Sequence, residues 1–161
     1  MSGEGLPPNG NGSSEGPRIQ LLAQYVKDLS FENPGAPMFA SVRPAIDLGV
    51  DLQARRVEGD QFEIEIRLRV SAKHEERPIF LMELTYSGIA LVQNVPEDVL
   101  SQILLIEVPH LLFPFARRVV ADTIRDGGMP PLMIEPIDFA ALYRAKAEQQ
   151  QQQMINPTAT A

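Results

Sequence analysis

The chain has 161 residues, a length typical of one folded domain. It carries 14 Lys and Arg against 21 Asp and Glu, and it has no cysteine. The resulting net charge of −7 argues against a nucleic-acid binder, which needs clustered cations. The missing cysteines exclude disulfides and thiolate chemistry. We expect no signal peptide, no membrane insertion and a cytoplasmic protein.

Both ends of the chain differ in composition from the middle. Residues 1–17 are rich in Gly, Pro and Ser, which predicts a disordered N-terminal tail. Residues 148–161 begin with a run of glutamines and are predicted to form a flexible C-terminal tail whose first residues extend a helix. One folded domain is therefore expected over residues 18–147.

Alternating side chains predict four strands. In the first, we assign Tyr25, Lys27, Leu29 and Phe31 to one face, and Val26, Asp28, Ser30 and Glu32 to the other. Apolar and polar residues also alternate over 46–53 and, most regularly, over 62–73. The turn at 58–60 joins these two segments into a hairpin. A fourth strand, over 79–87, is apolar on both faces.

Helical spacing replaces the strand pattern further along the chain. Pro96 precedes an acidic first turn, and Pro109 and Pro114 are expected to break or kink the helix that follows. Gly127-Gly128 ends this helix, and Asp138 caps a last helix that runs to about Gln150. The predicted fold class is α+β, a four-stranded antiparallel sheet packed against C-terminal helices.

A search for catalytic motifs finds none of the phosphate-loop, dinucleotide-binding, zinc-protease or nucleophile-elbow patterns. His74 lies in a charged turn and His110 at the predicted helix kink, so both are more readily explained as structural residues. We therefore predict no enzyme, no catalytic residue, no cofactor and no metal.

Three features point to binding surfaces, each with an alternative explanation. Ile79 and Leu81 are outward apolar residues that either meet a partner or are buried on both sides. Acidic residues gather on the outer strand faces, as a partner site or as a solvated surface. Segments 37–40 and 129–137 combine Met, aromatic and aliphatic residues in irregular chain, as an adaptable binding surface or as part of the core.

Three sequence blocks together resemble the SecB family of bacterial protein-export chaperones. The blocks are YVKDLSFENPGAP at 25–37, FLMELTYSGI at 80–89, and LLFPFAR at 111–117 with the Gly127, Pro130 and IDFAAL pattern that ends at Leu142. The resemblance covers about residues 19–147. It implies a chaperone without a catalytic site that holds unfolded preproteins in the cytoplasm and delivers them to the SecA ATPase. It also implies a homotetramer, arranged as a dimer of dimers.

The resemblance assigns roles to individual residues. SecA binding is expected at Asp28, Glu32, Leu81 and Glu83. Tetramer contacts are expected at Met82, Leu84 and Tyr86. The family's groove regions, together with the irregular apolar segments, place preprotein binding at Met38, Phe39, Leu132, Ile134 and Tyr143.

Two other functions stay open from the residues themselves. One is a chaperone or binding module for a single dedicated partner, such as a toxin. The other, which the residues support less, is a small lyase or isomerase that uses a carboxylate and His110.

Overall fold

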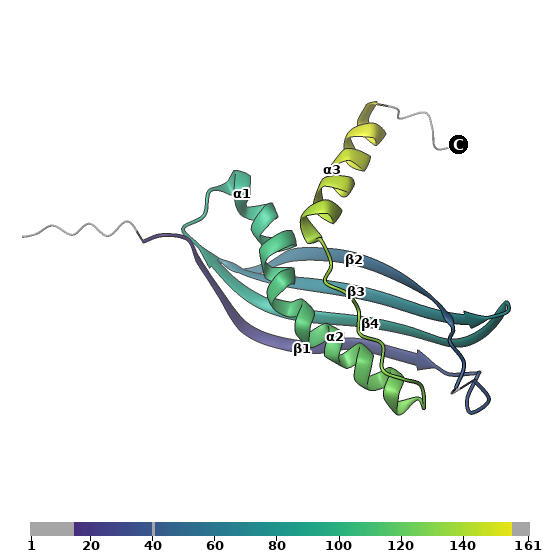
Figure 1. Ribbon diagram of the computed structural model, residues 1–161. Coiled ribbons are helices and arrows are strands. Elements are labelled where there is room, and N and C mark those ends of the chain that lie inside the picture. The colour runs from purple at the N-terminus through teal and green to yellow at the C-terminus, as the bar shows by residue number, and fades with distance from the viewer. Residues whose placement is uncertain (1–14, 40, 156–161) are drawn as a thin grey trace, which may run out of the picture.

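The computed structural model describes residues 15–39 and 41–155. The predicted disorder of residues 1–14 therefore lies outside the described part. Four strands form one antiparallel sheet in the order β1-β4-β3-β2: β1 (Arg18–Glu32), β2 (Ala45–Glu58), β3 (Gln61–His74) and β4 (Arg77–Gln93) (Figure 1). The predicted α+β class and the predicted β2–β3 hairpin are confirmed, and Gly59 makes the tight turn at a φ of +52°. β4 continues past the predicted change of pattern at Gly88.

A β-bulge in β1 changes the predicted assignment of its faces. Val26 lies opposite Tyr86 and Asp28 opposite Thr85, so Lys27 is an extra residue without a partner in the ladder. Tyr25 and Lys27 therefore point to the same outer face of the sheet as Asp28 and Glu32. The predicted grouping of Tyr25 and Lys27 with Leu29 and Phe31 is wrong, and so is that of Val26 with Asp28, because the bulge interrupts the alternation on which both groupings were based.

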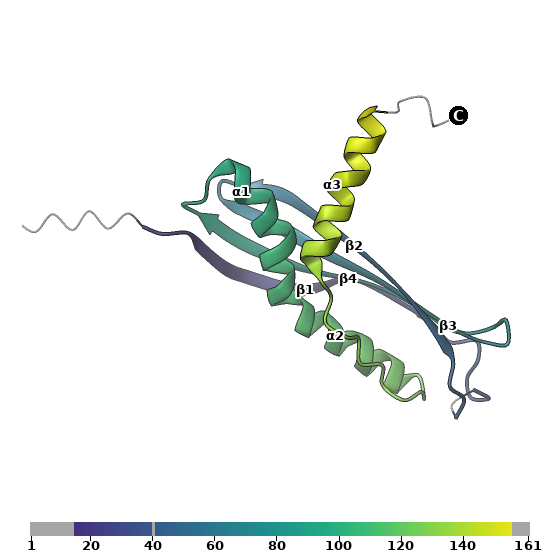
Figure 2. The ribbon, with the colours of Figure 1, turned by 45° about the horizontal axis from the view of Figure 1, so that its top comes forward.

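A nearly continuous helical layer covers the inner face of the sheet (Figures 1 and 2). It consists of α1 (Glu97–Gln102), the π-helical turn η1 (Ile103–Glu107) and α2 (Val108–Asp126). The expected break at Pro109 takes the form of this π turn, whose wider ring relieves the clash between a proline and the preceding turn. Pro114 lies inside α2 and is exposed to solvent.

The helical layer is long and apolar enough to meet the length and composition of a membrane span. Its 30 residues, Glu97–Asp126, include an 18-residue window with a mean hydropathy of 1.6. The layer packs on β3 and β4, so the covering of a sheet accounts for part of its apolar residues, while Leu111 and Phe115 remain exposed. The core lies between the two layers and includes Ile64, Ile66, Leu112 and Val120, all at 0% exposure.

The chain leaves α2 through a glycine cap and returns along it to α3 (Phe139–Ile155). Gly128 has a φ of +86°, and the Met129 amide donates to the Ile124 carbonyl at 3.3 Å. Asp138 caps α3 as predicted, because its Oδ1 accepts from the Ala141 amide at 2.9 Å. The helix continues through the glutamines, so residues 148–155 are helical, and this end stands clear of the sheet (Figure 1).

Gly88 is required where α2 crosses β4. A Cβ at this position would lie 2.7 Å from Leu112 Cδ2, so Gly88→Val is expected to lower the free energy of unfolding by ~1–3 kcal/mol. Gly49→Val is the matched control, because a Cβ there would meet Arg69 Cβ at an ordinary 3.8 Å. Thermal unfolding of both variants checks this. Equal stability of the two variants would contradict the close packing of α2 on β4.

Candidate functional site

The four residues expected at a docking surface lie together on the outer face of β1 and β4. Glu32 lies opposite Leu81, and Asp28 and Glu83 are two ladder positions apart across the same strand pair. Glu83 and both β1 carboxylates are exposed, while Leu81 is half-buried. We call Asp28, Glu32, Leu81 and Glu83 the acidic patch. The other outward apolar residue, Ile79, is at 0% exposure, because the turn after β1 packs on it and Gly35 donates its amide to the Ile79 carbonyl at 3.0 Å.

A stripe of cations borders the acidic patch on β3. Arg69 Nη1 lies 3.6 Å from Glu83 Oε1, and both side chains are more than half exposed. Arg67, Asp28 and Glu83 line a shallow hollow of about 400 Å³ next to this pair. A carboxylate of the acidic patch is therefore already paired within the protein.

A second group on the outer face is densely bonded around two buried carboxylates. We call Tyr25, Lys27, Arg55, Glu63, Glu65 and Arg67 the ion cluster. Lys27 Nζ donates to both Glu63 and Glu65, at 2.9 Å and 2.5 Å. Tyr25 and Arg55 also donate to Glu63, and Arg67 donates to Glu65. The Glu63 and Glu65 side chains are only 5% and 9% exposed, so these bonds compensate for the loss of hydration.

The hydroxyl of Tyr25, followed by the ammonium of Lys27, lowers the pKa of Glu63 from 4.5 to about 2. Because the folded pKa lies below the ordinary value, ionised Glu63 stabilises the folded state above about pH 4.5, and this contribution is lost as the pH falls toward 2. The shift corresponds to a contribution on the order of 3 kcal/mol. The difference in unfolding free energy between the wild-type protein and Glu63→Gln should shrink between about pH 6 and pH 2. Denaturant titrations at several pH values measure this difference. A difference that does not change with pH would contradict the stabilisation of ionised Glu63 by the ion cluster.

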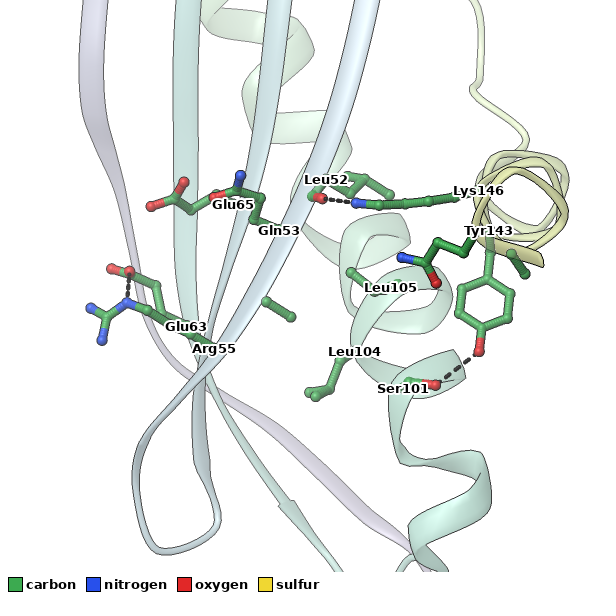
Figure 3. Close-up of a pocket in the computed structure, with 13 residues that line it drawn as sticks. Leu52, Gln53, Arg55, Glu63, Glu65, Ser101, Leu104, Leu105, Tyr143 and Lys146 are labelled. Carbon is green, nitrogen blue, oxygen red and sulfur yellow. Dashed lines mark hydrogen bonds and ion pairs between the residues drawn. The ribbon is translucent and has the colours of Figure 1, made fainter. Parts of the chain in front are cut away.

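A groove lies on the other side of the sheet, between β2, η1 and α3 (Figure 3). It consists of two adjoining hollows of about 490 and 300 Å³, which share Leu52, Leu105, Tyr143 and Lys146. We call it the α3 groove. Leu104 adds apolar surface, and the Glu63 and Glu65 head groups point away from α3 (Figure 3).

Polar groups at the α3 groove hold the helix against the sheet. Lys146 Nζ donates to the Leu52 carbonyl at 3.2 Å, and the hydroxyls of Ser101 and Tyr143 are 2.8 Å apart (Figure 3). The groove combines apolar side chains with polar groups at its rim. This combination suits an extended apolar segment of polypeptide, because the polar groups can hydrogen-bond to the backbone of that segment.

Of the five predicted groove residues, only Tyr143 lines the α3 groove. Met38 is 76% exposed, and the ring of Phe39 packs 5.9 Å from the ring of His74 at the end of β3. Leu132 is half-buried and Ile134 belongs to the core at 6% exposure. Phe39 packs at His74, whereas Tyr143 shares a hollow with Glu65, which is nine strand positions away, or about 30 Å of strand.

The three predicted tetramer residues face the helical layer within one protomer. Met82, Leu84 and Tyr86 are 0%, 2% and 7% exposed on the inner face of β4. One group of exposed apolar residues lies instead on the β1 edge and on α2: Ile19, Leu22, Val26, Leu29, Leu111 and Phe115. A second group lies on the opposite edge strand, β2: Ile46, Leu48 and Val57.

The sequence alone did not identify several residues of these surfaces. Leu52, Leu104 and Leu105 looked like ordinary core positions, and nothing set Lys146 apart from the other charges of its helix. The shared face of Glu63, Glu65 and Arg67 was visible in the sequence, but the acidic residues on it were left as either a partner site or a solvated surface. The bulge at Lys27, which brings a cation to these carboxylates, leaves no local sequence signal.

Comparisons with known proteins agree with this architecture. Residues 12–151 match the family model described as preprotein translocase subunit SecB. The chain is 50% identical over 142 residues to a protein-export protein SecB of Maricaulis maris, with 86% of this chain and 83% of the relative covered. It is 44% identical over 152 residues to the protein of the same name from Zymomonas mobilis, with 93% of each covered.

A solved structure shows the same fold at low sequence identity. It is the SecB-like chaperone of Mycobacterium tuberculosis in complex with a ChAD peptide from an antitoxin, at a TM-score of 0.64 and 14% identity. The match covers 74% of this chain and 91% of that one.

Proposed function

The chain belongs to the SecB family and is a chaperone of protein export, and from that premise we propose how its surfaces divide the work. The family binds preproteins and SecA. The α3 groove holds unfolded preproteins in the cytoplasm and keeps them competent for translocation. The acidic patch docks the SecA ATPase, and neither step uses a cofactor or a catalytic residue.

The observation that carries this proposal is the placement of the two surfaces. The acidic patch lies on the outer face of the sheet, whereas the α3 groove lies on the side of the helices. A preprotein in the groove therefore leaves the patch free, so both partners bind at once. Because burial of apolar surface is non-directional, the groove accepts clients of unrelated sequence.

We propose a homotetramer, built as a dimer of dimers. The support is the exposed apolar side chains of the β1 edge and α2, which a second protomer would cover. Met82, Leu84 and Tyr86 contribute to this assembly indirectly, because they are buried under α2, which carries part of the exposed apolar surface. A native mass of four chains supports the assembly, and a monomer at micromolar concentration contradicts it.

Titration with several unrelated unfolded proteins separates a general chaperone from a module with one dedicated partner. We expect similar affinities for all unfolded clients and no binding of the same proteins when folded. Binding of a single client would favour the dedicated module, and turnover of a small metabolite would favour an enzyme.

Arg69→Ala is expected to strengthen SecA binding. Arg69 competes with SecA for the carboxylate of Glu83, and an exposed ion pair is worth ~0.2–1 kcal/mol. Its loss should therefore tighten binding about twofold to fivefold at low salt, and less at high salt. Isothermal titration in the wild-type and Glu83→Gln backgrounds measures this. An equal gain in both backgrounds would show that Arg69 does not act through Glu83.

A further inference from the structure

The acidic patch depends on a feature of β1 that lies outside the patch. Tyr25 and Asp28 both point to the outer face of the sheet, although they are an odd number of residues apart. In a regular strand such residues lie on opposite faces. The extra residue at Lys27 is what places Tyr25 and Asp28 on the same face; a second register shift, between Leu21 and Ala23, lies before both of them.

Without the bulge, the outer side chains of β1 would change. Continued alternation from Tyr25 would turn Leu29 and Phe31 outward, and Asp28 and Glu32 toward the helical layer. Glu32 would then no longer lie beside Leu81 on the outer face. The bulge therefore sets which half of β1 contributes to the acidic patch.

The ion cluster holds the extra residue in place. Lys27 Nζ reaches across β4 to Glu63 and Glu65 on β3. The strand that it crosses carries Ser87 here, a small side chain at 0% exposure. Burial of both carboxylates makes loss of the Lys27 ammonium costly, because it is the one donor that bonds to both of them, although Tyr25 and Arg55 still donate to Glu63 and Arg67 to Glu65.

We propose that Lys27, held by Glu63 and Glu65, is a positioning residue for SecA docking: it fixes the β1 bulge and so presents Asp28 and Glu32 on the acidic patch. This inference rests on the proposed docking function of the patch. Lys27 itself does not contact SecA in this arrangement, because its ammonium is engaged by the two carboxylates.

The sign of one substitution separates positioning from simple charge. Lys27→Met removes a cation from an acidic docking face, so long-range attraction alone would tighten the binding of a basic partner surface. Loss of the bulge geometry would instead weaken docking. We expect roughly fivefold to tenfold weaker SecA binding for Lys27→Met, although the face has become more negative.

Two further variants serve as controls. Arg55→Met removes the same charge and also breaks a bond to Glu63, but Arg55 pairs regularly with Glu63 in the β2–β3 ladder. Arg55→Met should therefore lower the free energy of unfolding without weakening SecA binding. Lys27→Arg keeps a cation of sufficient length and should restore most of the SecA affinity.

The experiment is a SecA titration of these full-length variants beside Glu83→Lys, with native mass and preprotein affinity measured for each. Weak docking of Lys27→Met, with assembly, preprotein binding and the Arg55→Met control intact, supports the proposal.

Wild-type or tighter docking of Lys27→Met, while Glu83→Lys fails to dock, overturns the positioning role and leaves the docking patch standing. Normal docking of Glu83→Lys would overturn the patch itself, and the role of Lys27 with it. If Lys27→Met does not assemble, Lys27→Gln decides by the same criteria, because it also removes the cation but keeps a polar group that can donate to a carboxylate.

Discussion

Glu83→Lys should weaken SecA binding on the order of a hundredfold while the fold and the preprotein affinity persist. Glu83 lies between Arg69 on β3 and Ser30 on β1, near the middle of the acidic patch. Reversal of its charge places a cation where a basic partner surface must approach, and such like-charge contacts cost several kcal/mol. The side chain is 52% exposed, so the fold loses little.

Glu135→Lys is the matched control for this reversal. It makes the same change in net charge at an exposed position in the segment before α3, away from the acidic patch. SecA titration should leave it close to the wild-type protein. Equal losses for the two variants would mean that net charge, and not the patch, governs docking.

Phe39→Asp combined with Tyr143→Asp should weaken the binding of a long preprotein by about a hundredfold, against about tenfold for either change alone. Each substitution puts an unpaired charge where an apolar client segment must lose its water. We propose Phe39, which packs on His74 outside the α3 groove, as a second client anchor; about 30 Å of strand separates the two positions, so an extended client of roughly nine residues would bridge them. When one substitution removes an anchor, a long client still binds through the other.

Client length provides the control for this second prediction. A peptide too short to bridge the two anchors should respond to one substitution only, whereas a long client should respond to both. Melting temperature and native mass of the double variant are measured alongside. A large fall in melting temperature with loss of assembly would show that these side chains belong to the interior.

The strongest patterns in the sequence predicted the sheet and its cap residues. Twelve residues of strict alternation placed β3, and Asp138 marked the start of α3 because a side-chain oxygen at that position satisfies a free amide. The family resemblance named the four members of the acidic patch, and alternation placed them correctly on one outer face, because they lie on β4 and on the part of β1 after the bulge.

Irregular backbone explains what the sequence did not reveal. A bulge adds one residue to a strand without a recognisable sequence signal. Counting by two therefore assigned Tyr25 and Lys27 to the wrong face. Pro109 predicted an irregularity in the helix, but local propensity does not show that it takes the form of a π turn. Tyr143 and Phe39 were predicted to share one groove, but the length of β3 keeps them apart, and such distances depend on the tertiary fold.

The protease sensitivity of an unfolded preprotein diluted from denaturant tests the central claim most directly. With the wild-type protein present, the preprotein should stay sensitive to cleavage for long after it would have folded alone, and SecA should then release it. This holding effect should survive Glu83→Lys and be lost in Phe39→Asp with Tyr143→Asp. A preprotein that becomes protease-resistant at the same rate with and without the protein would contradict the account.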